Sequence, residues 1–280
     1  METRVSSATK EVIISGERPT VLIGERINPT GKKKLAAALQ AGDLDLVRQE
    51  ALAQVQAKAD ILDVNVGIPE VDEATLLPRA IRAVMDVVDV PLSIDSSNPK
   101  ALAAALETYR GKALINSVTG QNDSLEQILP LVKEHQAAVV GLTMDEEGIP
   151  TDADGRVSIA RKIVERATAM GIPREDIIID CLSMPTAADN KTAIVIIEAI
   201  RRIRAELGLN QTMGTSNVSF GLPDRPLLNS AFLAMVIQQG VTCPVVDVAK
   251  VRPFVLATDA LLGRDMYMQR YIQAFRERDK

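Results

Sequence analysis

The chain is poor in the residues that build metal sites, disulfide scaffolds and nucleic-acid surfaces. Its 280 residues include no Trp, one His and two Cys, and aromatic residues make up only 2%. One His and two Cys are too few for a disulfide scaffold or for a zinc site with several Cys and His ligands. The few aromatics leave little for stacking on bases, and the net charge of -5 disfavours phosphate-rich partners. We therefore expect no bound metal and no nucleic-acid partner.

Long hydrophobic runs are also missing. No apolar run reaches 18 residues, and the first twenty residues lack the apolar core of a signal peptide. The hydrophobic and charged fractions, 46% and 25%, are ordinary for a globular protein. These features predict a cytoplasmic protein that does not associate with membranes.

What the sequence does contain is a repeated alternation of short Val- and Ile-rich runs with longer segments of helical periodicity. Eight such runs predict strands, at residues 21–24, 60–66, 92–95, 113–116, 137–144, 177–180, 212–216 and 245–248. Helical periodicity occupies the segments between them, for example residues 36–58, 73–87, 98–109 and 190–207. Strands that are apolar on both faces and alternate with helices indicate a parallel sheet.

Eight βα units in one chain of this length predict an α/β fold of the (β/α)8 TIM-barrel type. A doubly wound open sheet is the alternative, but the glycine-rich first turn Gly-x-Gly-x-x-Gly is absent. No linker interrupts the pattern, so we expect one domain spanning residues 1–280. Within it, residues 1–19 are expected to form an extension across the bottom of the barrel, and residues 264–280 a terminal helix.

Polar residues stand at the end of every predicted strand, where the active sites of such barrels lie. They are Glu25 with Arg26 and Asn28, Asp63 with Asn65, Asp95 with Ser96, Asn116 with Ser117, Asp145, Asp180, Ser216 with Asn217, and Asp247. Carboxylates and amides can bind a neutral heterocycle that is rich in N–H donors. Asp95 and Asp180 are the sharpest candidates because each follows an apolar strand, although Asp95 could instead cap the next helix.

Seven short motifs follow one another in barrel order. They are Gly24-Glu25-Arg26-Ile27-Asn28, Leu62-Asp63-Val64-Asn65-Val66-Gly67, Ser93-Ile94-Asp95-Ser96, Ile115-Asn116-Ser117, Gly141-Leu142-Thr143-Met144, Ile179-Asp180 and Gly214-Thr215-Ser216-Asn217-Val218-Ser219. The set resembles the pterin-binding methyltransferases that move a methyl group between a corrinoid protein and tetrahydrofolate. These enzymes are relatives of dihydropteroate synthase and of the folate domain of cobalamin-dependent methionine synthase. The resemblance extends over nearly the whole chain.

This resemblance implies roles for individual residues. Asp95, Asn116 and Asp180 would bind the amino-pyrimidine edge and ring nitrogens of the pterin, and Asn217 would lie near N(5), which carries the methyl group. A pterin-binding role is also implied for four residues that line the cavity, namely Asn65, Ser216, Glu25 and Asn28. A tertiary amine is a poor leaving group, so a donor such as the Asn217 amide, strengthening as charge changes at N(5), would favour the transition state.

The resemblance further implies a cobalamin cofactor carried by a partner corrinoid protein, a folate substrate and a homodimer. The cobalamin-binding pattern Asp-x-His-x-x-Gly is missing, and the single His135 reads as a surface residue at a helix end. Dihydropteroate synthase is an alternative function, but its basic residues after the seventh and eighth strands are absent here. A non-catalytic pterin-binding subunit is a second alternative, and a zinc-dependent demethylase is disfavoured because Cys181 and Cys243 lack His partners.

Three further features have simple structural explanations. The basic run Lys32-Lys33-Lys34 could meet the glutamate tail of a folate, but the solvated start of a helix is the simpler explanation. Asp145 could supply a proton, although Glu146 and Glu147 beside it suggest a solvated loop. Arg225 and Asn229 are expected to fix the loop near the mouth rather than to act in catalysis.

Overall fold

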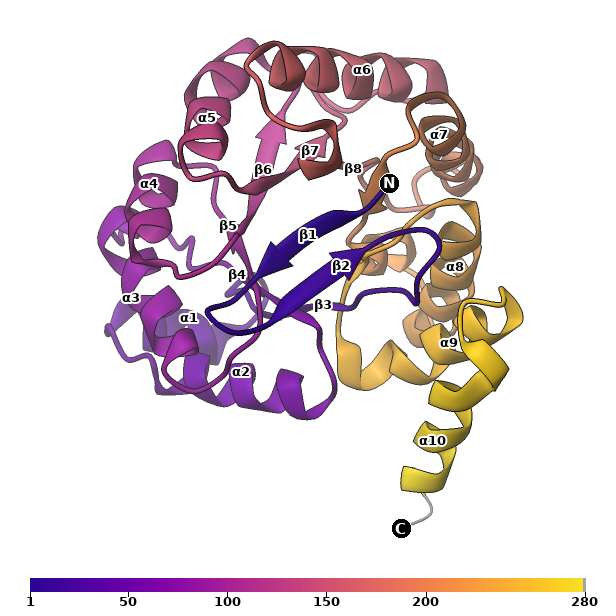
Figure 1. Cartoon of the computed structure of the whole chain (residues 1–280), viewed down its shortest axis with the longest axis horizontal. Helices are drawn as coiled ribbons and strands as arrows, with labels where there is room; N and C mark the ends of the chain where they lie inside the picture. The colour runs from indigo at the N-terminus through magenta and orange to yellow at the C-terminus, as the bar shows by residue number, and fades with distance from the viewer. Residues whose placement is uncertain (279–280) are drawn as a thin grey trace.

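The computed structural model describes residues 1–278, and these form an eight-stranded parallel barrel surrounded by helices (Figure 1). The strands run in the order β10-β3-β4-β5-β6-β7-β8-β9. Their bounds are Ile23–Ile27 for β3, Ile61–Val64 for β4, Leu92–Asp95 for β5, Leu114–Thr119 for β6, Ala138–Leu142 for β7, Ile177–Asp180 for β8, Asn210–Thr212 for β9 and Val245–Val246 for β10. A parallel bridge between Gly214 and Val245 brings β9 to β10 and nearly closes the ring. The predicted TIM barrel is confirmed.

Helices cover the outside of the barrel in the described part of the chain. They are α1 (Lys33–Gln40), α2 (Asp45–Gln56), α3 (Glu73–Met85), α4 (Pro99–Thr108), α5 (Asn122–Glu134), α6 (Ala153–Ala169), α7 (Thr192–Leu207), α8 (Arg225–Gln239), α9 (Val248–Leu261) and α10 (Gln269–Arg278). Asp72 and Asp152 cap α3 and α6 by accepting from the backbone N–H groups of Ala74 and Gly155. None of these helices is long and apolar enough to cross a membrane.

The core has two layers, as expected for strands that are buried on both faces. One lies between the strands and the helices and contains most of the buried aliphatic side chains. The other fills the barrel itself and includes Ile23, Ile61, Leu114 and Ile178, none of which is exposed. In β8 the three consecutive Ile residues supply both layers, because neighbouring side chains of a strand point to opposite faces.

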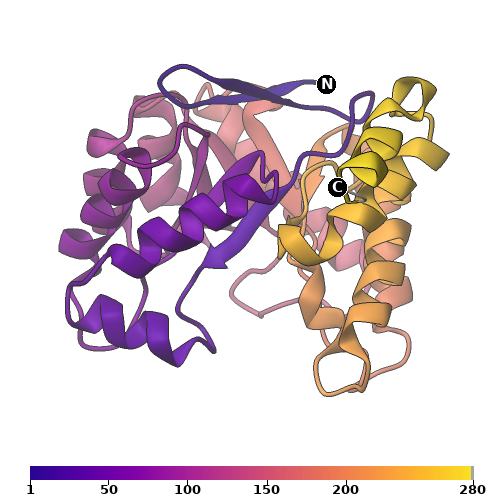
Figure 2. The same cartoon turned by 90° about the horizontal axis from the view of Figure 1, so that it is seen from below.

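An antiparallel hairpin closes the amino end of the barrel. It consists of β1 (Thr3–Ser6) and β2 (Glu11–Ile14), and its Val5 and Ile14 complete the apolar layer inside the barrel. Asn210 Nδ2 donates to Thr3 Oγ1 at 3.0 Å and to the carbonyl of Ile14 at 2.9 Å. Figure 2 shows the hairpin at the end opposite the loops that follow the strands. The hairpin therefore covers the interior of the barrel at its amino end.

Several predicted boundaries were wrong. The single helix expected at residues 36–58 is two helices, since Gly42 turns the chain between them with a φ of +70°. The strand expected at residues 212–216 ends at Thr212, and residues Thr215–Ser219 form the short 3-10 helix η2. The first barrel strand begins at Ile23, where its pairing with Ile61 and Val245 starts, so Glu25 and Arg26 lie within the strand rather than after it. The final strand stops at Val246, and α9 begins at Val248.

The segment after α9 is helical only in part. A 3-10 turn, η3 (Met266–Met268), precedes α10, and residues 279–280 lie outside the described part of the chain. Asp259 of α9 anchors the start of the barrel, because its carboxylate accepts from Thr20 N at 2.9 Å and from Thr20 Oγ1 at 2.7 Å. Arg270 of α10 lies 3.6 Å from the same carboxylate. The buried Asp259 carboxylate thereby connects the segment before the first barrel strand with α10, whose Arg270 side chain is partly exposed.

Candidate active site

A cluster of buried polar side chains lies at the carboxyl ends of β4, β5 and β6. Its centre is Asp63, which is 3% exposed. Asp63 Oδ1 accepts from Ser93 Oγ at 2.6 Å and from Asn116 Nδ2 at 3.1 Å. The register that pairs Asp63 with Ser93 across β4 and β5 sets this geometry. Asp63 was predicted at its strand end but was not among the predicted site residues.

Asp95 is the second carboxyl group of this cluster. Burial raises its pKa well above the ordinary range for Asp, and the charge of Asp63 raises it further, while the Asn65 amide lowers it in part. Burial also raises the pKa of Asp63, which the hydrogen bonds from Ser93 and Asn116 partly oppose. Desolvation and the repulsion between the two charges therefore favour the protonated form of Asp95. Asp95 does not cap α4, since Asn98 does so by accepting from Lys100 N at 3.0 Å.

Asp180 forms a separate acceptor at the end of β8. It is 8% exposed, and burial raises its pKa to about 7. Its Oδ1 accepts from Leu182 N at 2.6 Å, and Oδ2 makes no hydrogen bond to any residue that the structure describes. The buried Arg156 of α6 holds the following loop by donating to the carbonyls of Cys181 and Leu182, and its charge lowers the pKa of Asp180 in part. Nothing in the sequence around Arg156 had pointed to it.

Two of the predicted amides are engaged in local turns. Asn65 Oδ1 accepts from Gly67 N at 2.9 Å, and Asn28 Oδ1 accepts from Thr30 N at 2.9 Å. These bonds fix the loops after β4 and β3. Asn65 also neighbours Asp95, whereas no hydrogen bond among the described residues connects Asn28 with the Asp63–Asp95 cluster.

Ser216 and Asn217 lie in η2, on the far side of the mouth from the carboxylate pair. Arg225 fixes this loop, donating from Nη2 to the carbonyl of Ser216 at 2.9 Å and from Nε to Ser219 Oγ at 3.1 Å. Its guanidinium also packs over the Phe220 ring at 5.8 Å. This is the loop-fixing role expected for Arg225. Asn217 is exposed, and no hydrogen bond within the described residues holds its side-chain amide.

Glu25 belongs to a charged network at the ends of β3 and β10. Burial and the nearby charge of Asp247 raise the pKa of Glu25. Asp247 pairs with Lys250 at 2.9 Å and lies 3.7 Å from Arg26. Lys32 donates to the backbone carbonyls of Glu25 and Arg26, at 3.3 and 2.8 Å. The first Lys of the basic run therefore supports the β3 turn, and the next two begin α1 at the surface.

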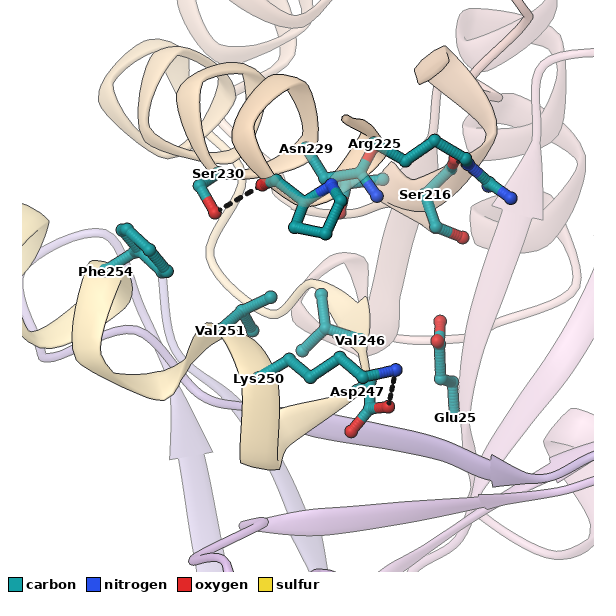
Figure 3. A pocket seen from close by; sticks show the side chains of 12 residues that line it. Glu25, Ser216, Arg225, Asn229, Ser230, Val246, Asp247, Lys250, Val251 and Phe254 are labelled. Atoms are coloured by element: carbon teal, nitrogen blue, oxygen red, sulfur yellow. Dashed lines mark hydrogen bonds and ion pairs between the residues drawn. The ribbon is translucent and has the colours of Figure 1, made fainter. Parts of the chain in front are cut away.

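A cavity of about 320 Å³ adjoins this network (Figure 3). Glu25 and Ser216 line it on the side of the barrel mouth, and it continues between the first turns of α8 and α9 to Phe254. Of the predicted site residues, it brings together only Glu25 and Ser216. Asp95, Asn116 and Asn65 gather around Asp63 instead. Asp145 lies in a tight turn, its Oδ1 accepting from Glu147 N at 3.0 Å, and so matches the loop that its neighbours suggested.

The Cys and His residues take structural positions. Cys181 and Cys243 are both buried, and burial raises the pKa of Cys243 to about 12, which is typical of an unreactive thiol. His135 caps the end of α5, as its sequence context indicated. Across residues 1–278, no three His, Cys, Asp or Glu side chains are grouped in a way that could hold a metal ion.

Comparison with known proteins places this site in a family. Residues 24–247 match the model of the family described as pterin binding enzyme. The chain is 32% identical to a methylcorrinoid:tetrahydrofolate methyltransferase of Eubacterium limosum, over 92% of this chain and 96% of that protein. It is 31% identical to methionine synthase of Mycobacterium leprae over 90% of this chain, but it spans only 22% of that longer protein.

Solved structures with the same fold include two dihydropteroate synthases. The enzyme of Yersinia pestis superposes with a TM-score of 0.71 at 18% identity, over 94% of this chain and all of that one. The enzyme of Stenotrophomonas maltophilia gives a TM-score of 0.68 at 19% identity, over 93% and 98% of the two chains. At such identities the likeness concerns the fold alone. The family match spans most of the barrel, and the chain therefore belongs to the pterin-binding enzyme family.

Proposed function

We propose that the chain is a methyltransferase that moves a methyl group between N(5) of tetrahydrofolate and the cobalt of a corrinoid on a partner protein. In this reaction methyltetrahydrofolate, a proton and the cob(I)alamin protein give tetrahydrofolate and the methylcob(III)alamin protein, with the proton taken up by N(5) from solvent, and the reverse reaction uses the same site. The methyltransferase of Eubacterium limosum, which matches over nearly its full length, supports this assignment.

The observation that carries the proposal is the pair of buried acceptor sites at the mouth. A pterin presents N–H donors on its pyrimidine edge, and a buried carboxylate with an open oxygen satisfies two of them. Asp180 has such an oxygen, because only its Oδ1 is bonded to the backbone. Around Asp63, the bond from Asn116 Nδ2 leaves the amide oxygen of Asn116 to accept from a ligand. We assign pterin binding to Asp95, Asn116 and Asp180, with Asn65, Ser216, Glu25 and Asn28 around them.

We assign the catalytic role to Asn217. Its amide has no partner among the described residues, and it stands on a loop that Arg225 holds in place. An amide that donates to N(5) without titrating stabilises the change of charge in the transition state. By analogy with the removal of an oxyanion-hole donor, losing this amide would cost about 2.7–4 kcal/mol of transition-state stabilisation.

The remaining parts of the proposal concern the setting of the enzyme. We propose that the cobalamin is a substrate carried by a separate corrinoid protein, that the chain works as one domain, that two copies form a homodimer, and that it acts in the cytoplasm. A dihydropteroate synthase activity is less well supported. Pyrophosphate release calls for basic groups after β9 and β10, and those positions hold Asn217 and Asp247.

An anaerobic spectrophotometric assay tests the function. Free methylcob(III)alamin serves as the methyl donor and tetrahydrofolate as the acceptor, and the absorbance of cob(I)alamin reports the transfer. We expect conversion that depends on both the enzyme and tetrahydrofolate. Absence of conversion, with a corrinoid protein also supplied, would refute the proposal.

A further inference from the structure

Arg156 is a buried arginine in the first turn of α6, and neither its burial nor its position favours a cation. Only 2% of the residue is exposed, and no ion pair of the described chain includes its guanidinium. Taking a cation out of water without a paired anion costs free energy, and the positive end of the helix dipole adds to that cost. The local stability of α6 therefore does not explain an arginine at this position.

Every hydrogen bond that Arg156 makes within the described chain goes to a backbone carbonyl. Nε donates to the carbonyl of Pro150 at 3.0 Å, and Nη1 donates to those of Cys181 and Leu182, the latter at 2.9 Å. Cys181 and Leu182 directly follow Asp180, the last residue of β8. Arg156 thus joins the loop before α6 to the turn that carries this carboxylate.

The turn after β8 contains a residue in an unfavourable backbone conformation. Leu182 has a φ of +57°, in the left-handed region that residues with a Cβ rarely adopt. Such strain persists only where neighbouring groups hold it. Here Leu182 N donates to Asp180 Oδ1 at 2.6 Å, and the Leu182 carbonyl accepts from Arg156. Because Oδ1 is engaged in this turn, the conformation of the turn decides where Asp180 Oδ2 points.

Arg156 also acts on the charge of Asp180. Its guanidinium is the cation that lowers the pKa of this carboxyl, against the burial that raises it. The residues paired with Asp180 in the sheet, Leu142 of β7 and Thr212 of β9, do not titrate. The two cysteine thiols near it are buried, which raises their pKa values and keeps them neutral. Within the described residues, Arg156 is thus the group that favours the ionised form of Asp180.

We propose that Arg156 is a positioning residue for pterin binding, which holds the turn after β8 in the conformation that presents Asp180 Oδ2 to the ligand. The inference rests on the proposed function, because it concerns how the same site is assembled. Arg156 itself does not contact the ligand and acts through Asp180. In the rival explanation Arg156 only fastens one loop to another, and its removal would then lower stability without changing the titration of Asp180 or the affinity for the pterin.

The first experiment follows the titration of Asp180 without any ligand. Carbon-13 NMR of protein labelled at its aspartate carboxyl groups gives the midpoint, and the signal of Asp180 is the one missing from Asp180→Asn. We expect a midpoint of about 7 in the wild type. The midpoint should lie about one pH unit higher in Arg156→Met, which removes the cation, and should keep its wild-type value in Arg156→Lys. An unchanged midpoint in Arg156→Met would overturn the proposal.

The second experiment separates the geometry of the turn from the charge. At pH 9 Asp180 is largely ionised in the wild type and in both variants, so the Kd for tetrahydrofolate in anaerobic calorimetry reports the position of Oδ2. We expect Arg156→Met to raise this Kd about tenfold, and Arg156→Lys, which keeps one donor group for the turn, to raise it about threefold. An unchanged Kd in Arg156→Met would contradict the positioning role. If that variant does not fold, an unchanged Kd in Arg156→Lys has the same consequence.

A matched control lies at the opposite end of β8. Arg174 is partly buried and donates from Nη2 to the carbonyl of Leu207 at 2.6 Å. Arg174→Met removes the same kind of hydrogen bond and should change neither the midpoint nor the Kd; an equal rise in Kd would point to a general loss of stability and overturn the proposal. If the wild type does not bind tetrahydrofolate, the proposed function fails, whereas the titration still decides whether Arg156 acts on Asp180.

Discussion

Replacing Asp180 by Asn is expected to stabilise the fold and to weaken pterin binding. The pKa of Asp180 rises from 3.8 to about 7 because the folded barrel buries it. The folded state therefore holds the proton more tightly than the unfolded state, and stability falls as the pH rises from about 4 to about 7. The difference between 3.8 and about 7 corresponds to a cost of at most about 4 kcal/mol above pH 7. Between pH 5 and pH 8 that cost grows by roughly 2–3 kcal/mol.

Asn removes this cost and keeps the local hydrogen bond. Its Oδ1 can still accept from Leu182 N, which lies 2.6 Å from the carboxylate. We expect the melting temperature of Asp180→Asn to exceed that of the wild type by several degrees at pH 8 and by clearly less at pH 5. Thermal unfolding followed by circular dichroism at the two pH values measures this difference.

The affinity for the pterin should fall in the same variant, although its stability rises. The Asn amide directs an NH₂ group at the N–H donors of the pterin, so one acceptor is lost and two donors face each other. We expect the affinity for tetrahydrofolate, measured by anaerobic calorimetry, to fall about 10- to 100-fold. In the wild type, affinity should rise with pH and level off above about 7, because the ligand binds the ionised carboxylate.

A matched control lies on the same loop. Asp189 is exposed, and its Oδ1 accepts from Lys191 N at 2.8 Å, again two residues along the chain. Asp189→Asn should change neither stability nor affinity. An Asp180→Asn variant with the wild-type pH dependence of unfolding, or with wild-type affinity for tetrahydrofolate, would contradict the role assigned to the Asp180 carboxylate.

Three further variants address other parts of the molecule. Asn217→Ala should lower the rate of methyl transfer about 10²- to 10³-fold in stopped-flow assays while changing the Kd for tetrahydrofolate little, and equal losses in both would remove its transition-state role. Asp95→Asn should weaken tetrahydrofolate binding at least tenfold in calorimetry, since an NH₂ donor replaces one acceptor oxygen, and an unchanged Kd would contradict the assignment to the pterin edge. Asn210→Ala removes two hydrogen bonds to the hairpin and should lower the free energy of unfolding in urea by about 1–3 kcal/mol. The Kd for tetrahydrofolate should stay the same, and a changed Kd would show that the amino end of the barrel is coupled to the mouth.

The fold was predictable where a strand is apolar on both faces. The strands Leu92–Asp95 and Ile177–Asp180 were predicted to the residue, because such runs fit only a parallel sheet buried on both sides. The strand Asn210–Thr212 was not predicted to the residue, since its three residues are polar and form no apolar run. They are buried all the same, and their side chains bond to the hairpin and to backbone carbonyls, for example Gln211 Nε2 to Ile200 O at 2.9 Å. Local polarity carries no information about such distant partners.

The sequence predicted which strand ends carry site residues, but not the hydrogen bonds and contacts between those residues. Asp95 and Asp180 were identified because burying a carboxylate at the end of an apolar strand costs free energy unless the group is paired or binds a ligand. Asp63 was not predicted as a site residue. It lies opposite Ser93, in the strand next to that of Asp95, and this neighbouring position could have indicated a pair of carboxylates. Arg156 could not have been found, because it lies within a long helix and reaches its carbonyl partners only in the folded barrel. The cavity between α8 and α9 depends in the same way on how two outer helices pack.

Some buried polar groups are fully paired within the chain, and others keep an acceptor that a ligand could use. At the amino end, the Asn210 amide finds both of its acceptors within the chain, on the hairpin that closes the barrel. At the carboxyl end, Asp95 and Asp180 are buried without cations close enough to offset the burial, so their pKa values rise. A carboxyl group in that condition gains most from a ligand that brings N–H donors, because the same bonds that hold the ligand also stabilise the charge. Under the proposed function, these incompletely paired acceptors at the carboxyl end are the groups that a donor-rich ring would contact.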